Sequence, residues 1–538
     1  MIKWLLVSLL LLLIFIQTFL GARLFSVAMD EQVHLPVGFV HLQSIEIEFD
    51  KSSTPFIGML TALPGFLFSK PSINLSDQYI LNNDFWNFGN KFLFSNNADQ
   101  LVLWGRLVII SLVLLLGVYV FKWADELFGT KAGLFSLFLF AFIPVVIGHA
   151  QLISTDVGLT VFFFISSYYF WKSLTTPGVQ RTPGVNQILA GVFMGMALGS
   201  KFSGVLLAPL FVLFACLTEF KTLNVGNINQ KLRNFVRIVL PVFAVGFLVL
   251  WAIYFFPKNL NFYSDGLKLL YSEDANPDYL NYLNGNFKEG GWRYYFIEGF
   301  LIKTPIPLLV FIFWSLAWFR KHKITFADKM SLLLPVAFLA VSTSLSAHNI
   351  GVRYLIPIYP FLAVYSGGIV SRITNYELGN KISFKSIIHN SKFLILSMLS
   401  IWYVFSSIRV YPNQLAYFNE FVGGSDNGYK YMDDSNIDWG QDLKRLKKFI
   451  DENPKTKVVY VWRQGDRALD YYGIGKEKNI IYRKENWWAE PKGTYAVSSH
   501  FIVRAKIMSR LYSDPSLDWS SLYQPVKRIG QSLFIYEF

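Results

Sequence analysis

Long apolar runs separated by short polar segments occupy the first three quarters of the chain. About 20 apolar residues of helix are needed to cross the hydrocarbon core of a bilayer, so a run near this length predicts a membrane span. Eleven runs qualify, near residues 4–22, 105–121, 132–150, 157–173, 187–200, 203–219, 236–256, 298–318, 331–346, 355–371 and 393–410. The pattern predicts a polytopic α-helical membrane protein with about 11 transmembrane helices.

The charge distribution predicts the orientation of these spans. The short loops around residues 151–156 and 347–353 hold almost no basic residues, whereas the loops that alternate with them are basic. The basic side holds Lys3, Lys122, Lys131, Lys172, Arg181, Lys221, Lys231, Arg233, Arg237, Arg320, Lys321, Lys323, Lys329, Arg372, Lys381, Lys385 and Lys392. The positive-inside rule makes this side, with the N-terminus, cytoplasmic. Loops 23–104 and 257–297 are then extracytoplasmic, and we expect the plasma membrane of a bacterium.

Residues 1–410 are expected to form the membrane domain and residues 411–538 a separate extracytoplasmic domain. The tail has ordinary polarity and predicts a small α/β fold. Its expected elements are a helix at 441–452, with Leu443, Leu446, Phe449 and Ile450 as the buried face, and strands at 458–462, 479–483, 495–503 and 533–536.

The composition excludes an ordinary soluble protein and argues against a nucleic-acid partner. Hydrophobic residues make up 53% of the 538 positions, charged residues only 16%, and the mean hydropathy is +0.37. The net charge of +13 comes largely from loops whose placement follows membrane topology and which suit anionic lipid head groups. Cys216 is the single cysteine, so no intrachain disulfide can form. The first apolar run exceeds a signal-peptide core, and a retained anchor is expected.

Asp30 and Glu31 follow directly after the first span. Two adjacent carboxylates are costly to bury in lipid, so they are expected to face water or a polar cleft at one membrane surface. An ordinary solvated loop would also satisfy them. We interpret the pair as the mouth of an active site, because other unusual polar residues are predicted at the same surface.

Seven further polar or ionisable residues lie at or near the ends of spans, where burying their polar groups in the membrane costs free energy. They are Arg106, His149, Asp156, Lys201, Lys303, Arg353 and Tyr354. Each one alone could be an interfacial residue that keeps its polar group in water. Together, the cations suit a phosphate carried by a lipid, and a carboxylate beside it suits a general base. The set predicts transfer of a group from a lipid phosphate to a hydroxyl.

Lys201 interrupts a long apolar stretch and is preceded by regularly spaced glycines. Gly191, Gly195 and Gly199 recur at every fourth position. This spacing predicts close packing of one helix against another. Such packing would bring Lys201 beside other spans.

The tail opens with a dense polar stretch at residues 433–442. Its alternating Asp and Asn residues resemble a calcium loop, but Trp439 and Arg445 stand where Gly and Glu are required, which excludes an EF-hand. Another metal site stays open, although no His or Cys cluster suggests zinc. The polar groups could instead cap the following helix, or bind a sugar or acceptor. The residues expected to do so are Asp434, Asn436, Asp438, Trp439 and Gln441.

In order along the chain, these motifs resemble those of the GT-C glycosyltransferases, specifically the bacterial protein O-mannosyltransferase and aminoarabinose-transferase-like family. The resemblance covers nearly the whole chain. The motifs are Asp30-Glu31, Trp104-Gly105-Arg106-Leu107, Ser154-Thr155-Asp156, Gly199-Ser200-Lys201-Phe202-Ser203-Gly204, Tyr294-Tyr295, Lys303-Thr304-Pro305, Gly351-Val352-Arg353-Tyr354-Leu355-Ile356-Pro357, Tyr417-Phe418-Asn419-Glu420 and Asp434 to Asp442. Relatives often carry His-Pro-Pro where this chain has Ser53-Thr54-Pro55-Phe56, so its donor or acceptor contacts stay open.

The resemblance implies an inverting transfer, without metal or cofactor, from a polyprenyl-phosphate sugar to a hydroxyl of a protein, glycolipid or cell-wall glycan outside the cytoplasm. It implies that Asp30 is the catalytic acidic residue and that Glu31 assists. The donor phosphate would be held by Lys201 and Arg353, with Arg106 and Lys303 as further candidates. Tyr354, His149 and Asp156 are expected beside them.

Two readings from other classes compete with a glycosyltransferase. A transporter or flippase for a polar lipid would place polar residues near the membrane midplane, often in paired repeats, whereas here they gather at one face. A non-catalytic membrane scaffold whose tail binds glycans would leave the outer lysines and arginines unexplained. An inactive but folded Asp30→Asn variant would favour the enzyme over both.

Overall fold

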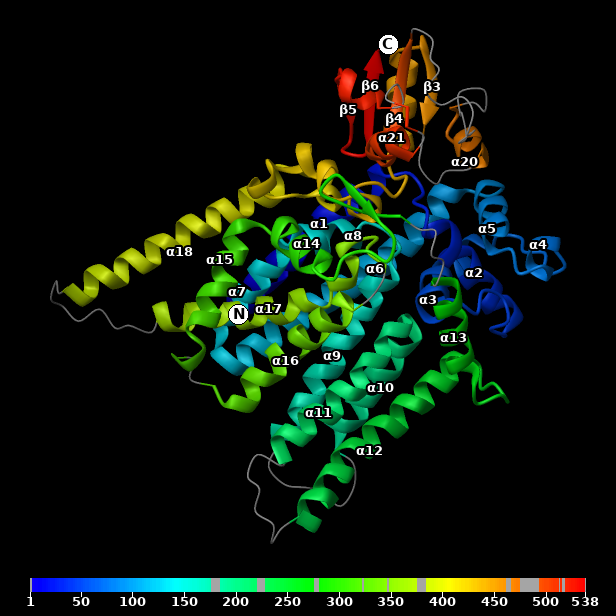
Figure 1. The fold of residues 1–538 in the computed structure, drawn as a ribbon. Coiled ribbons are helices and arrows are strands. Elements are labelled where there is room, and N and C mark those ends of the chain that lie inside the picture. The colour runs from blue at the N-terminus through cyan, green and yellow to red at the C-terminus, as the bar shows by residue number, and fades with distance from the viewer. Residues whose placement is uncertain are drawn as a thin grey trace.

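The apolar runs form a helical bundle. The computed structural model describes residues 2–175, 184–219, 228–274, 280–321, 324–345, 348–374, 384–460, 466–474, 493–511, 513–514 and 518–537. Each of the eleven runs overlaps a helix or a bent pair of helices. The bundle consists of α1 (Ile2–Leu24), α6 (Ala98–Phe128), α7 (Thr130–Ala141), α8 (Pro144–Ala150), α9 (Thr155–Thr175), α10 (Val185–Ser200), α11 (Leu207–Glu219), α12 (Ile228–Ile253), α14 (Tyr295–Lys303), α15 (Ile306–Ala317), α16 (Phe326–Ser344), α17 (Ile358–Thr374) and α18 (Phe384–Ile408) (Figure 1).

The bundle is that of a multi-pass membrane protein. In the described part of the chain, six helices are long and apolar enough to cross a membrane, and two bent helix pairs raise the number to eight. The pairs α7–α8 and α14–α15 are bent by 62° and 112°. Pro144 and Pro305 stand at these breaks, because a residue without an N–H cannot continue the preceding helix. The expected count of about 11 spans is not confirmed.

The predicted glycine packing is confirmed between α10 and α12. A Cβ added to Gly191 would lie 2.7 Å from the carbonyl oxygen of Val242, and one on Gly195 would lie 2.6 Å from that of Gly246. The two backbones therefore approach at a distance that only glycine allows. This contact holds α10 against α12, and Lys201 follows directly after the last residue of α10.

The first long loop, residues 23–104, is expected outside the cytoplasm, and we call it the first outer loop. It folds against one side of the bundle as α2 (Glu31–Ser44), α3 (Phe56–Pro64), α4 (Gln78–Leu81) and α5 (Phe85–Phe94) (Figure 1). Helices α2 and α3 cross at two glycines, because a Cβ on Gly38 would lie 2.1 Å from the Gly58 carbonyl oxygen. The second long loop holds α13 (Phe262–Asp274) and a hairpin of β1 (Asn281–Leu283) and β2 (Asn286–Lys288). Both loops contribute residues to the cavity described below.

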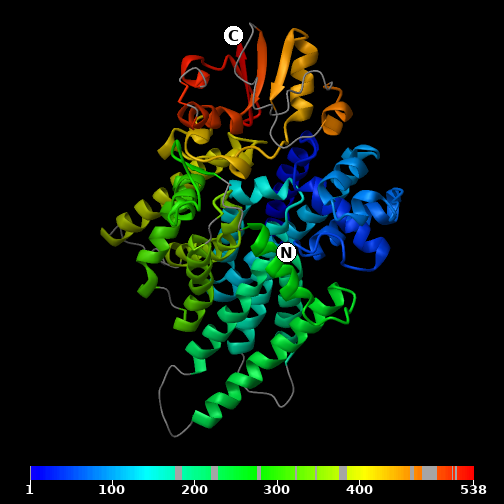
Figure 2. The same ribbon diagram turned by 45° about the vertical axis from the view of Figure 1, so that its right-hand side comes forward.

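The tail carries a four-stranded sheet at one end of the bundle (Figure 2). The strand order is β3-β4-β6-β5, with β3 parallel to β4 and the other pairs antiparallel. Its elements are α19 (Leu443–Glu452), β3 (Thr456–Tyr460), α20 (Asp466–Tyr471), β4 (Thr494–Ser498), α21 (Ser499–Leu511), α22 (Trp519–Leu522), β5 (Lys527–Ile529) and β6 (Leu533–Glu537).

Most of the elements expected in the tail are present. Helix α19 and its buried face match the prediction, as does strand β6. Strand β3 overlaps the strand expected at 458–462, of which residues 461–462 lie outside the described residues. The expected strand at 495–503 is wrong beyond Ser498, because buried Phe501, Ile502 and Ala505 recur at helical spacing and lie in α21. The strand expected at 479–483 lies outside the described residues.

Candidate active site

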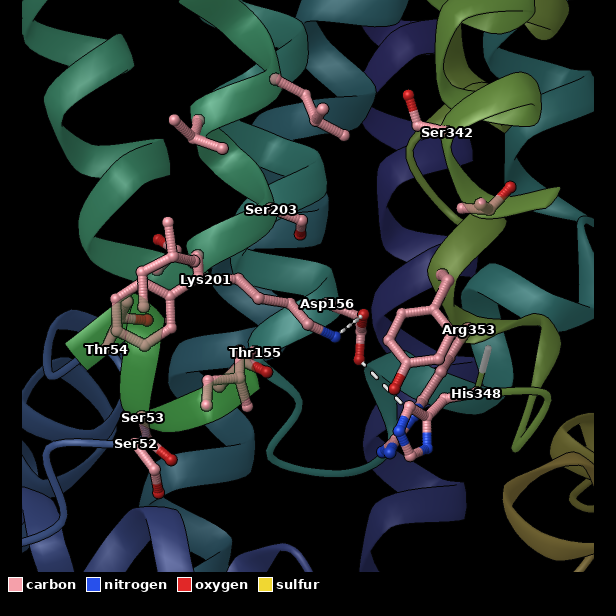
Figure 3. A pocket seen from close by; sticks show the side chains of 18 of the residues that line it. Ser52, Ser53, Thr54, Thr155, Asp156, Lys201, Ser203, Ser342, His348 and Arg353 are labelled. Atoms are coloured by element: carbon pink, nitrogen blue, oxygen red, sulfur yellow. Dashed lines mark hydrogen bonds and ion pairs between the residues drawn. The ribbon is translucent and has the colours of Figure 1, made fainter. Parts of the chain in front are cut away.

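A cavity of about 390 Å³ opens where the first outer loop meets the bundle. Its charged lining comes from four separate segments: Asp30 before α2, Asp156 in the first turn of α9, Lys201 after α10, and Arg353 in the short helix Val352–Leu355. Figure 3 shows Lys201, Asp156 and Arg353 pointing toward one another across this cavity. Sequence positions more than 300 residues apart are therefore brought to one place, as predicted for Asp30, Lys201 and Arg353.

Asp30 precedes α2 but does not cap it. Its carbonyl oxygen accepts hydrogen bonds from the backbone N–H groups of Val33 and His34, while its side chain makes no capping bond. The carboxylate instead accepts a hydrogen bond from Arg353 Nη1 at 2.7 Å. The side chain of Asp30 is 22% exposed, so this carboxylate remains in reach of a molecule in the cavity.

Lys201 points into the cavity because the chain leaves α10 at this residue. Its φ and ψ of −163° and 143° are extended, and a 3-10 turn, Phe202–Leu206, follows. Lys201 Nζ donates to Asp156 Oδ1 at 2.5 Å, and its charge lies 4.3 Å from the centre of the Tyr354 ring. The second oxygen of Asp156 lies 4.0 Å from Arg353 Nε.

The four charged groups form an alternating chain, Asp30–Arg353–Asp156–Lys201, whose formal charges cancel. Asp156 is the buried member, at 3% exposure, while Lys201 at 23% and Asp30 at 22% remain partly open. Such a cluster can hold an anionic group against the two cations and present a carboxylate beside it.

The rest of the lining suits an amphiphilic molecule. Besides the four charged residues, the lining holds serine and threonine hydroxyl groups, two histidines and apolar side chains. These residues are His34, Ser52, Ser53, Thr54, Thr155, Ser200, Phe202, Ser203, Val205, Leu206, Leu267, Leu270, Phe296, Ser342, Thr343 and His348.

Sequence reasoning missed two kinds of residue in this lining. His34 lies one helical turn after Asp30, and this i, i+4 spacing on a helix start was the signal that could have found it. Leu267 and Leu270 lie on α13, in a loop far along the chain, and nothing in their local sequence indicates that they reach the cavity.

Glu31 and Arg106 form a buried ion pair and do not line the cavity. Glu31 accepts from Arg106 Nε and Nη2 at 2.8 and 2.6 Å and from the backbone N–H groups of Ala28 and Ile153. The remaining donors of Arg106 bond to the carbonyl oxygens of Ala22, Phe25 and Ser26. Both side chains are at most 3% exposed, so the pair braces the segment before Asp30 against α6 and the turn at Ile153.

Lys303 and His149 also lie outside the cavity lining. Lys303 is fully buried and donates to the carbonyl oxygens of Leu415 and Asn436 at 2.8 and 2.5 Å. His149 Nδ1 lies 2.7 Å from the carbonyl oxygen of Val145, which can only accept, so this nitrogen carries the proton. The His149 ring packs edge-on against Trp439.

The polar stretch at the start of the tail is buried between the sheet and the bundle. Asn436 Oδ1 accepts from the Val352 N–H, next to Arg353, and the Trp439 ring lies 4.9 Å from the guanidinium of Arg353. Asp434, Asp438 and Gln441 are at most 4% exposed, and none of the stretch lines the cavity.

The carboxylates of this stretch bond within the tail. Asp438 accepts from the Gly440 N–H and from Ser498, and burial raises the pKa of Asp438 to about 7. Asp442 occupies the N-cap of α19, but its carboxylate bonds to Ser532 and Arg445 instead of capping the helix. In the described part of the chain, no group of three or more His, Cys, Asp or Glu side chains could hold a metal ion.

Known proteins resemble both the sequence and the fold. Residues 93–251 match the family model described as dolichyl-phosphate-mannose-protein mannosyltransferase. That stretch includes Arg106, Asp156 and Lys201. No sequence among the curated proteins matches the chain.

The oligosaccharyltransferase of Archaeoglobus fulgidus in its apo form is similar in fold, with a TM-score of 0.51 at 13% identity over 90% of this chain and 62% of that chain. The chain has the GT-C fold. ArnT from Cupriavidus metallidurans bound to undecaprenyl phosphate aligns over 99% of this chain and 97% of that chain, at 14% identity and a TM-score of 0.49. The archaeal oligosaccharyltransferase AglB, in complex with an inhibitory peptide and a dolichol-phosphate, aligns over 90% of this chain and 62% of that chain. Its identity is 14% and its TM-score 0.49.

The predicted resemblance to GT-C glycosyltransferases of the protein mannosyltransferase type is thereby confirmed. This GT-C chain spans 62% of the length of the archaeal oligosaccharyltransferase.

Proposed function

We propose that this GT-C protein is a membrane glycosyltransferase that moves a sugar from a polyprenyl-phosphate donor to an acceptor hydroxyl, with inversion at the sugar. The observation that carries the proposal is the cavity in which Asp30, Arg353, Asp156 and Lys201 alternate beside an apolar wall. A lipid-linked phosphate presents one anion and one long apolar chain, and the lining offers a partner for each. The family model matched by residues 93–251 also describes enzymes that use such a donor.

In the proposed reaction the acceptor oxygen bonds to C1 of the sugar as the bond from C1 to the phosphate oxygen breaks. The electron pair of that bond goes to the phosphate, whose growing charge is stabilised by Lys201 and Arg353. The proton of the acceptor hydroxyl goes to the carboxylate of Asp30. Attack from the face opposite the leaving phosphate inverts the configuration at C1. Asp156 holds Lys201 in place through the 2.5 Å hydrogen bond.

The proposed reaction takes place on the extracytoplasmic side. The distribution of charge in the sequence supports this side, because the basic loops are those expected in the cytoplasm. Residues of the first outer loop and of the bundle line the cavity. The tail lies at the end of the bundle next to α5 of this loop (Figures 1 and 2). The acceptor is then a hydroxyl of a protein, glycolipid or cell-wall glycan that reaches this surface.

The test follows release of polyprenyl phosphate from radiolabelled polyprenyl-phosphate sugars by the purified protein in nanodiscs, with detergent-extracted membranes as the source of acceptor. Asp30→Asn should lower the rate at least about 100-fold, since general acid–base groups contribute factors of this size. Asp77→Asn is the matched control, because Asp77 is also a carboxylate of the first outer loop paired with a lysine, at 2.6 Å from Lys91, but lies outside the cavity.

Equal rates for the Asp30→Asn variant and the wild type would overturn the assignment of Asp30. A wild-type protein that neither binds nor turns over any polyprenyl-phosphate lipid would overturn the proposed function. Binding and translocation of the lipid without release of polyprenyl phosphate would favour a transporter instead.

A further inference from the structure

The two cations of the cavity are already engaged by carboxylates. Among the described residues that line it, Lys201 and Arg353 are the only lysine or arginine side chains. Lys201 bonds to Asp156, and Arg353 bonds to Asp30. An arriving phosphate therefore meets a cluster without net charge, and it must take over at least one cation to bind strongly.

The exposure of the two carboxylates decides which ion pair can open. Asp156 is 3% exposed, so loss of Lys201 would leave a buried charge with only Arg353 at 4.0 Å to offset it. Asp30 is 22% exposed and borders the cavity, so it can exchange its partner for water or a substrate hydroxyl. The pair between Asp30 and Arg353 is the one that opens at the lower cost.

We infer that Asp30 and the donor phosphate compete for Arg353, so that donor binding releases the base. This inference rests on the proposed function and adds the order in which donor and acceptor bind. In the resting protein Arg353 holds Asp30 at 2.7 Å; once the phosphate takes Arg353, the carboxylate of Asp30 turns to the acceptor hydroxyl. The donor thus binds before a productive acceptor does.

The same ion pair resets the site after transfer. After transfer, Asp30 carries the proton of the acceptor and is neutral, while the phosphate has gained a second negative charge. Arg353 therefore stays with the phosphate. When Asp30 loses its proton to water, its charge returns, and the pair with Arg353 forms again once the polyprenyl phosphate has dissociated. Each turnover ends with the pair that began it.

The test measures binding of undecaprenyl phosphate to the full-length protein in nanodiscs, without any sugar donor or acceptor. Asp30→Asn should bind this lipid about tenfold more tightly than the wild type, a difference of about 1.4 kcal/mol, because Arg353 no longer has a competing carboxylate. Asp77→Asn, which changes a carboxylate outside the cavity, should bind as the wild type does.

A double-mutant cycle separates competition for Arg353 from a general loss of negative charge. In an Arg353→Met background, Asp30→Asn should no longer change the affinity. An equal gain in both backgrounds, or weaker binding by Asp30→Asn alone, would overturn the competition. If the wild type turns over the donor but Asp30→Asn shows no gain in affinity for undecaprenyl phosphate, the competition is overturned and the glycosyltransferase proposal stands. If no form of the protein binds this lipid, both are overturned.

Discussion

Replacing Arg106 removes one half of the buried ion pair with Glu31. The resemblance suggests a contact with the donor phosphate, but the guanidinium is 3% exposed and lies outside the cavity. It makes five hydrogen bonds, two to Glu31 and three to backbone carbonyl oxygens of residues 22, 25 and 26. We therefore expect Arg106→Met to reduce stability and to leave the chemistry of the folded protein largely unchanged.

The expected loss is large because both partners are buried. Replacing Arg106 leaves the carboxylate of Glu31, which is 0% exposed, without its cation. Removing one partner of a buried ion pair costs about 3–5 kcal/mol. Glu31→Gln should also destabilise, but Arg106→Met and Glu31→Gln together should cost about 1–3 kcal/mol less than the sum, because no unpaired charge remains.

The assay is unfolding of the purified protein in mixed detergent micelles, followed by tryptophan fluorescence, for the wild type, both single variants and the double variant. Turnover is then measured per folded molecule. Folded Arg106→Met should keep its rate within about tenfold of the wild type, in contrast to the at least 100-fold loss of Asp30→Asn. If the stability loss of the double variant equals the sum of the two single losses, the bracing role is refuted. If Arg106→Met folds but no longer binds the donor, Arg106 contacts the donor phosphate after all.

The remaining predictions concern the cavity, the tail and the first outer loop. Lys201→Met should raise the KM for the donor about tenfold or more, measured by steady-state kinetics, with Lys201→Arg recovering part of the loss. Burial raises the pKa of Asp438 to about 7 from about 3.9 in the unfolded chain, so it favours folding at low pH and this contribution is lost between about pH 4 and 7. Asp438→Asn should remove that pH dependence. Unfolding curves should then show that the free energy of unfolding of the variant, relative to that of the wild type, is about 2–4 kcal/mol higher at pH 8 than at pH 5. Gly38→Ala should destabilise by about 1–3 kcal/mol, because its Cβ would meet the Gly58 carbonyl oxygen at 2.1 Å, whereas Gly184→Ala, with nothing nearer than 3.9 Å, should be nearly neutral in thermal unfolding.

The positions of the helices could be predicted because each depends on a local run of apolar residues. The number of spans could not, because it depends on how long each straight segment is. The sequence shows Pro144 and Pro305 inside apolar runs, but the bends of 62° and 112° that they accompany are set by packing against other helices.

The cavity could be predicted in part for a similar reason. Asp30, Lys201 and Arg353 were found because a charge at the end of an apolar run is unusual wherever it occurs. The same signal also selected Glu31, Arg106 and Lys303, which satisfy their charges inside the protein. Sequence alone cannot separate the two groups, because a charge buried against backbone carbonyl oxygens and a charge lining a cavity leave the same local pattern.

The contact between the tail and the segment before Asp30 has a consequence for biosynthesis. The Ser26 and Met29 N–H groups donate to the carbonyl oxygens of Gln441 and Trp439, and Ser26 Oγ bonds to Gly440, 414 positions away. The ribosome makes the Asp30 segment among the first residues and its binding partner only in the last quarter of the chain. A nascent protein that has inserted every span still holds this segment without residues 439–441, to which its backbone bonds. The end of the molecule that holds the proposed active site is therefore completed last, and a chain that ends before residue 439 lacks these contacts.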